Sequence, residues 1–135
     1  MTGAEPTRCA IELVAGPDDI DELGHVSNQV YLRWVLEVAM AHTRACGWDH
    51  AEYRAAGAVF VVRRHELDYI AQVRAGESLA AETWVSAWRL ASCTRSTEIR
   101  RGTQVVMRAA TTWAFVAFAN GRPQRIPDEL RALFE

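Results

Sequence analysis

The pattern of hydrophobic and polar residues changes its period several times along the chain. Residues 7–14 alternate weakly and stop at Gly16-Pro17, which predicts a first strand. From about Asn28, apolar residues recur at the spacing i, i+3, i+4, i+7, which predicts a helix with one buried face that stops near Gly47. The members of that face are Tyr31, Trp34, Val35, Val38, Ala39 and His42.

The rest of the chain predicts mainly strands. Residues 50–57 fit a short helix capped by Gly57, and residues 58–70 are rich in β-branched and aromatic residues, which favour a strand. Further strands are expected at 78–90, 92–101 and 103–118, joined by short antiparallel links near 74–77, 90–91 and 101–102. Residues 126–134 predict a closing helix that begins at Pro127 or Asp128.

This order of elements predicts an α+β fold. A five-stranded antiparallel sheet has one face to cover, and the long helix is the only expected element with the length to cover it. The strand expected at 103–118 is apolar on both faces, interrupted only by Arg108 and Thr112. Its second face therefore needs a partner, which indicates a homodimer or a higher assembly.

Composition narrows the class of protein. The 135 residues form one domain by size, 1–135, and a net charge of -2 with a pI near 6.1 gives no electrostatic reason to expect a nucleic-acid partner. No apolar run has the length of a membrane span, and the first residues lack the basic and apolar segments of a signal peptide, so we expect a cytoplasmic protein. Cys9, Cys46 and Cys93 stand far apart, which favours reduced, mostly buried thiols.

The candidate chemistry lies in "DIDELGHVSNQVYLRWVLE", residues 19–37, where acids, Gly24, His25 and Asn28 precede the long helix. The N-terminus of a helix has unpaired N–H groups and the positive end of the helix dipole, which suit a developing oxyanion. A plain capping loop also gathers acids, and Asn28 also suits an N-cap. The remaining histidines show no metal spacing, so no metal is expected, and no G-x-S-x-G motif is present.

These residues resemble the signature D-x-x-x-H-V-N-N-x-x-Y-L-x-[WF]-x-E of hotdog-fold acyl thioesterases. The matching positions are Asp21, His25, Val26, Asn28, Tyr31, Leu32 and Trp34, and Glu37 stands one residue after the position of the signature's Glu. The chain is similar to bacterial long-chain acyl-CoA thioesterases and plant acyl-ACP thioesterases, and more distantly to 4-hydroxybenzoyl-CoA thioesterases. Ser27 replaces the first Asn of the usual pair, and Leu23 stands where the plant enzymes carry a catalytic Asn.

The resemblance implies a hotdog fold and hydrolysis of an acyl-CoA or acyl-ACP thioester to free acid and thiol, with coenzyme A only as part of the substrate. It implies that Asp21 acts as nucleophile or as general base for water. His25 is expected to orient Asp21, polarise the carbonyl or protonate the leaving sulfur, and Asn28 to cap the helix and fix substrate. Gly24, Val26 and Tyr31 would line the acyl site. Glu37 is expected to be an exposed carboxylate or to pair with an arginine across an interface.

Two arginines outside the motif extend the resemblance. Trp88-Arg89 is similar to a stretch that contacts the CoA nucleotide in hydroxybenzoyl-CoA thioesterases, although Leu90 and Ala91 replace the basic residues that follow there. Arg125 is a looser match. Two other functions stay open: a hotdog enoyl-CoA hydratase or dehydratase, whose D-x-N-P-x-H pattern "DELGHV" lacks, and an acyl-binding module without catalysis.

Overall fold

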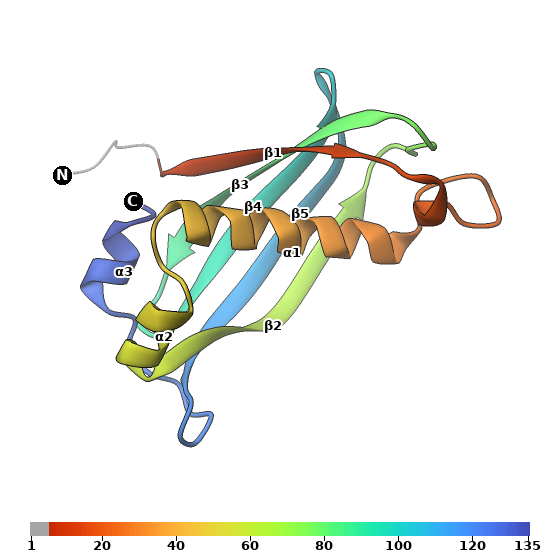
Figure 1. Ribbon diagram of the computed structural model, residues 1–135. Coiled ribbons are helices and arrows are strands. Elements are labelled where there is room, and N and C mark those ends of the chain that lie inside the picture. Colours follow the sequence, from red (N-terminus) through yellow and green to blue (C-terminus); the bar gives the residue numbers. More distant parts are fainter. Residues whose placement is uncertain (1–5) are drawn as a thin grey trace.

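The computed structural model describes residues 6–135, which form the expected elements around one long helix (Figure 1). The predicted strands and helices are confirmed, with ends that differ by a few residues at most. Their bounds are β1 (Arg8–Val14), the 3-10 turn η1 (Pro17–Asp19), α1 (Asn28–Ala45), α2 (His50–Ala56), β2 (Ala58–Tyr69), β3 (Ser78–Trp88), β4 (Ser92–Arg101), β5 (Gln104–Ala117) and α3 (Asp128–Ala132).

The five strands form one antiparallel sheet in the order β1-β3-β4-β5-β2. The links from β3 to β4 and from β4 to β5 are hairpins, as predicted. The prediction that residues 74–77 join two paired strands is wrong, because β2 pairs with β5 and the chain must cross the sheet to reach β3. This crossover is held in the core by Val73, which is fully buried and whose carbonyl accepts a 2.8 Å hydrogen bond from the amide of Val26.

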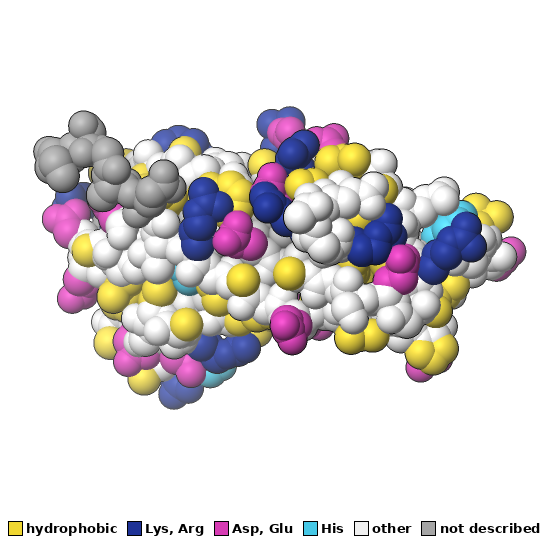
Figure 2. Space-filling view, turned by 90° about the horizontal axis from the view of Figure 1, so that it is seen from above, with side chains coloured by type: hydrophobic (Ala, Val, Ile, Leu, Met, Phe, Trp, Pro, Cys, Tyr) yellow, Lys and Arg dark blue, Asp and Glu magenta, His cyan; other side chains and the backbone are white. Residues whose placement is uncertain are grey.

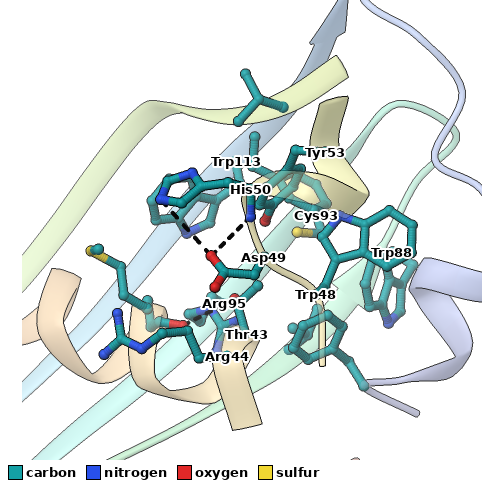
Figure 3. Close-up of a pocket in the computed structure, with 16 residues that line it drawn as sticks. Thr43, Arg44, Trp48, Asp49, His50, Tyr53, Trp88, Cys93, Arg95 and Trp113 are labelled. Carbon is teal, nitrogen blue, oxygen red and sulfur yellow. Dashed lines mark hydrogen bonds and ion pairs between the residues drawn. The ribbon is translucent and has the colours of Figure 1, made fainter. Parts of the chain in front are cut away.

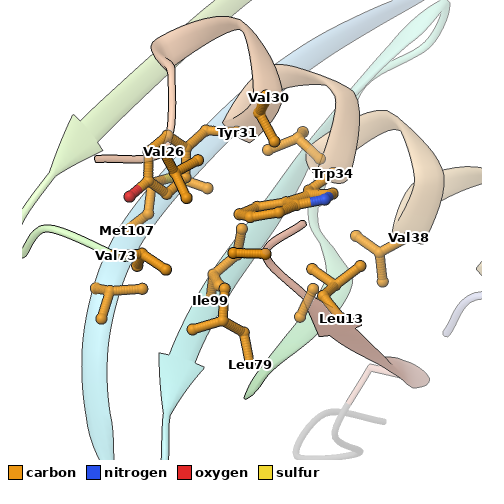
Figure 4. Packing of buried hydrophobic residues seen from close by; sticks show 14 of the residues in the cluster. Leu13, Val26, Val30, Tyr31, Trp34, Val38, Val73, Leu79, Ile99 and Met107 are labelled. Carbon is orange, nitrogen blue, oxygen red and sulfur yellow. The ribbon is translucent and has the colours of Figure 1, made fainter. Parts of the chain in front are cut away.

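Helix α1 lies across the sheet, and the face predicted from its periodicity is buried throughout. Trp34 occupies the middle of the first apolar cluster, with side chains from α1, β1, β3, β4 and the crossover around it (Figure 4). A second cluster contains Trp48, Phe115, Leu130 and Phe134, and it fills the space between the sheet and the short helices α2 and α3. The burial of these two clusters fixes where both ends of α1 lie on the sheet.

A group of buried polar side chains lies among these apolar residues. It consists of His42, Thr83, Arg95, Thr97 and Thr111, each at most 5% exposed. The hydroxyl of Thr83 donates to the carbonyl of Ser96 at 2.8 Å, and Arg95 donates through Nη1 to Nδ1 of His42 at 2.8 Å and to Thr83 at 3.3 Å. Of this group, only His42 was predicted to be buried.

The surface carries charges of both signs. Figure 2 shows arginine and acidic side chains interspersed over one face, without a continuous patch of a single sign. The outer face of β5, expected to be apolar, also presents Arg108, which pairs with Glu98 of β4 at 3.0 Å, while Glu98 also pairs with Arg100. Among residues 6–135, no helix has the length and hydropathy needed to span a membrane.

Candidate active site

The polar loop before α1 is a tight, closed turn. The amide of Asp21 donates to the carbonyl of His25 at 2.8 Å, and the amide of Gly24 donates to the carbonyl of Asp21 at 3.1 Å. Gly24 has φ +83°, a left-handed conformation that L side chains rarely adopt. A bridge between Ile20 and Val26 closes the base of the loop, and Val26 belongs to the apolar core.

The carboxylate of Asp21 is held by the loop itself. Its Oδ1 atom accepts hydrogen bonds from the amides of Leu23, at 2.9 Å, and His25, at 3.3 Å. Within residues 6–135, Oδ2 has no hydrogen-bond partner and the carboxylate forms no salt bridge. One oxygen therefore fixes the orientation of the group, and the other remains available to a substrate or a water molecule.

The N-terminus of α1 opens beside this carboxylate. The N-cap is Ser27, whose hydroxyl accepts from the amide of Gln29 at 3.3 Å, and the carbonyl of Ser27 accepts from the amide of Val30 at 3.0 Å. The prediction that Asn28 caps the helix is wrong, because Asn28 is already the first helical residue. Its own amide has no partner in the described part of the chain, so one donor at the positive end of the helix is left unpaired.

Asp21 and Asn28 border the same depression, which has a volume of about 670 Å³. The other residues around it are Leu23, His25, Val26, Tyr31, Tyr69, Ile70, Ala71 and Gln72. Five of the predicted site residues thus lie together: Asp21, His25, Val26, Asn28 and Tyr31. Gly24 lies in the adjoining turn and does not border the depression.

The comparisons with known proteins agree with this picture. Residues 15–134 match the Thioesterase-like superfamily. The chain belongs to this superfamily. A comparison with curated protein sequences finds no match. The predicted family and the class of enzyme, a thioester hydrolase, are therefore confirmed by the match over most of the chain.

Solved thioesterase structures share the fold at low sequence identity. A 4-hydroxybenzoyl-CoA thioesterase variant with its substrate bound aligns with a TM-score of 0.86 at 20% identity, covering 95% of this chain and 99% of that one. A 1,4-dihydroxy-2-naphthoyl-CoA thioesterase from Synechocystis aligns with a TM-score of 0.84 at 15% identity, covering 94% of this chain and 95% of that one. A putative oleoyl thioesterase from Lactobacillus plantarum aligns with a TM-score of 0.91 at 17% identity, and the alignment covers 97% of this chain and 52% of that one. These likenesses confirm the hotdog architecture.

The ring of His25 is not oriented toward Asp21 by a hydrogen bond. Within the described residues of this thioesterase, only the backbone amide of His25 reaches the Asp21 carboxylate, and no hydrogen bond involves its ring nitrogens. Tyr31 is buried, contacts the rings of Trp34 and Tyr69 edge to face, and has its pKa raised by burial. Tyr31 is therefore a wall of the depression and part of the core.

The loop is also tied to α1 by charge. Arg33 donates to the carboxylate of Asp19 at 2.9 Å and lies 3.6 Å from that of Glu37. The hydrogen bond from Arg33, together with one from the amide of Gly16, lowers the pKa of Asp19. Glu37 is thus an exposed carboxylate beside an arginine of its own helix, as the first of the two expectations stated.

Arg89 and Arg125 do not border this depression. Arg89 donates to the hydroxyls of Ser92 and Thr94, both at 2.9 Å, and Arg125 pairs with Asp128 at 3.1 Å. Both belong to the end of the molecule that carries α3, opposite the N-terminus of α1 in Figure 1. A role in binding the CoA nucleotide stays a prediction for these two residues, since one chain alone does not bring them to Asp21.

A second, more apolar cavity lies between the C-terminal half of α1, α2 and the sheet (Figure 3). Its volume is about 390 Å³, and its walls include Trp48, Trp88, Trp113 and Arg95. Cys93 also faces it, and burial raises the pKa of that thiol to about 11, so the thiol is a poor nucleophile. Sequence reasoning missed this cavity, although Arg95 shares the inward parity of Cys93 and Ile99 on β4.

Proposed function

We propose that this chain hydrolyses an acyl-CoA thioester and that Asp21 is the catalytic carboxylate. The observation that supports the proposal is the meeting of the Asp21 carboxylate and the unpaired amide of Asn28 at one depression. A thioester carbon placed between them has an anion on one side and a hydrogen-bond donor at the positive end of a helix on the other. Those are the two groups that hydrolysis of a thioester requires.

The reaction follows from this arrangement. The carbonyl oxygen of the thioester accepts a hydrogen bond from the Asn28 amide, which stabilises the negative charge that develops on that oxygen. Oδ2 of Asp21 either attacks the carbonyl carbon, giving an anhydride that water then cleaves, or removes a proton from an attacking water molecule. The C–S bond breaks in both routes, and the products are the free acid and the thiol.

His25 is assigned a role at either the leaving sulfur or the carbonyl oxygen of the thioester. Its half-buried side chain borders the depression and its ring is not engaged by another described residue, so the ring can donate a proton to the departing sulfur or a hydrogen bond to the carbonyl oxygen. The substrates named for the solved relatives include 4-hydroxybenzoyl-CoA and 1,4-dihydroxy-2-naphthoyl-CoA. They support coenzyme A as the carrier over acyl carrier protein.

A second copy of the chain is expected to complete the site. Strand β2 is an edge strand that pairs only with β5 among residues 6–135, and its outer edge leaves backbone groups open to another strand. Val61 and Val62 of β2 are more than a third exposed, and Tyr69 and Ile70, which border the depression, are about half exposed. A homodimer formed through β2 covers these side chains and encloses the substrate.

The test replaces Asp21 in two ways. Asp21→Asn keeps an oxygen that can accept from the amides of Leu23 and His25 but removes the negative charge, whereas Asp21→Ala removes both. We expect kcat/KM for a panel of acyl-CoAs to fall by about 100-fold or more in both variants, with the loop better preserved in the first. Glu22→Gln, an exposed acid of the same turn outside the depression, is the matched control and should stay active.

The same assay separates the alternatives. A folded Asp21→Asn variant with full turnover contradicts the proposed role of the residue. Hydration of enoyl-CoA without release of free thiol indicates the hydratase, and binding of acyl-CoA by the unaltered protein with no turnover indicates the acyl-binding module. Mass detection of the free acid and thiol distinguishes these outcomes directly.

A further inference from the structure

The apolar cavity beside Arg95 has a charged group that none of the residues described by the structure neutralises. Arg95 is 5% exposed, and within residues 6–135 it forms no salt bridge with a carboxylate. An arginine keeps its positive charge at neutral pH, and a buried charge without a counter-ion costs several kcal/mol. A buried cation of this kind is retained where something else supplies the negative charge.

The hydrogen bonds of Arg95 leave one particular edge of the guanidinium unused. Nη1 donates to His42 and to Thr83, whereas Nε and Nη2 have no partner among the described residues. Neither of these nitrogens is completely enclosed, and the residue borders the cavity. The N–H groups of Nε and Nη2 are the parallel pair with which arginine binds both oxygens of a carboxylate.

Other unpaired polar atoms gather around the same cavity. In the described chain the fully enclosed side-chain nitrogens without a partner are Nε2 of His42, whose other ring nitrogen Nδ1 accepts from Arg95, and Nε1 of Trp48 and Trp113, which form cavity walls. Buried polar atoms without partners are few in native proteins and require an explanation. Because these atoms are fully enclosed, they lie behind the cavity walls, and the unpaired donors that remain open to a ligand are Nε and Nη2 of Arg95.

The shape and the lining define the rest of that ligand. Figure 3 shows Trp48, Trp88 and Trp113 around the space that Arg95 enters. A volume of about 390 Å³ lies within the range of small-molecule pockets, and aromatic walls favour an apolar body. Met40 and Arg44, both exposed, lie at the rim and mark the entrance.

We propose that this cavity binds a carboxylic acid with an apolar body, with the carboxylate on Nε and Nη2 of Arg95 and the body between the tryptophan rings. The site lies eleven or more residues along α1 from Asn28, about 16 Å at 1.5 Å per residue, so it is distinct from the Asp21 depression within one chain. The ligand is either a free acid or the far end of an acyl group that carries a second carboxylate.

Calorimetry with an acid and its uncharged analogue tests the site in the unaltered protein. The probes are 4-phenylbutanoate and 4-phenylbutanamide, which share the apolar body and differ in the charge that Arg95 would bind. We expect the acid to bind at least tenfold more tightly than the amide at pH 7. Equal affinities, or no binding of the acid at millimolar concentration, would overturn the proposal.

Substitutions then assign the preference to Arg95. Arg95→Met should remove the difference between acid and amide, and Arg95→Lys, which keeps the charge but loses the paired donors, should retain part of it. Arg44→Gln, an exposed arginine at the rim of the same cavity, is the matched control and should retain most of it. A folded Arg95→Met variant that still prefers the acid contradicts the assignment.

Enzyme kinetics distinguishes the two possible sources of the carboxylate, a free acid and the far end of an acyl group. Only this kinetic experiment rests on the proposed function. If 4-phenylbutanoate competes with an acyl-CoA, so that the KM for the acyl-CoA rises while kcat stays unchanged, the cavity is the binding site of the acyl group. An acid that changes kcat instead supports a separate regulator. The calorimetry stands apart from catalysis, because Asp21→Asn should bind the acid as the unaltered protein does, even if neither hydrolyses a thioester.

Discussion

The pair formed by His42 and Arg95 makes the stability of the fold depend on pH. Arg95 donates to Nδ1 of His42, so that nitrogen carries no proton in the folded chain. Burial, together with the positive charge of Arg95, lowers the pKa of His42 to about 4, from an ordinary value near 6.5. Between these two values the unfolded chain binds a proton that the folded chain does not.

Stability should therefore fall as the pH is lowered from about 6.5 to about 4, and the contribution of His42 should be fully present above that window. We expect His42→Gln, which does not titrate, to lose less stability over that window, with a slope shallower by up to about 1.4 kcal/mol per pH unit. Urea denaturation at a series of pH values measures the difference.

His50→Gln provides the comparison, since it makes the same substitution at an exposed histidine. Equal slopes for His42→Gln and the unaltered protein would contradict the folded-state pKa of His42.

At the scale of elements, two neighbouring residues at the start of α1 have different expected roles, one in the stability of the helix and one in the chemistry of the site. Ser27 supplies the N-cap, whereas Asn28 is exposed at the first helical position and borders the depression. We expect Ser27→Ala to lower the free energy of unfolding by about 1 kcal/mol, because the amide of Gln29 loses its acceptor. Asn28→Ala should change it by less than about 0.5 kcal/mol.

Thermal unfolding of both variants measures this division. A larger loss of stability in Asn28→Ala than in Ser27→Ala would show that the side chain of Asn28 has a structural role as well.

The elements themselves follow from the sequence because their signals are local. The period of Tyr31, Trp34 and Val38 defines α1, and Gly57 ends α2 as predicted, in a left-handed conformation with φ +71°. The site loop is predictable for the same reason, since Asp21 lies only seven residues before Asn28, the first residue of α1.

Contacts between distant segments do not follow in this way. Gly76 marks a turn, with φ +84°, but nothing near it states that β2 pairs with β5 and not with β3. Likewise, the alternation of buried and exposed residues along β4 indicates that the side chain of Arg95 points inward. Its partner His42, however, lies on another element 53 residues away. Such pairings arise from the packing of the whole domain. The second cavity arises from the same packing, so it could not be predicted from local signals.

At the scale of the whole molecule, the two ends of β2 indicate how two chains would assemble. The middle of the strand is basic, with Arg63 and Arg64, and the part that follows is acidic, with Glu66 and Asp68. Antiparallel pairing of two β2 strands centred between Arg64 and His65 sets Arg63 of one copy opposite Glu66 of the other, a favourable cross-strand pair. It also brings Phe60, at the cavity of one copy, toward Tyr69, at the depression of the other.

We therefore expect the chain to be a dimer in solution, with twice the 15.1 kDa of one copy, about 30 kDa. Val62→Lys places a charge on the exposed edge of β2 and should shift the mass measured by light scattering toward that of one chain. Hydrolysis should fall with it, because each depression loses its cover. Val14→Lys, at an exposed position of the opposite edge strand β1, should leave mass and activity unchanged. A monomeric wild-type protein with full activity would instead mean that one chain encloses the substrate by itself.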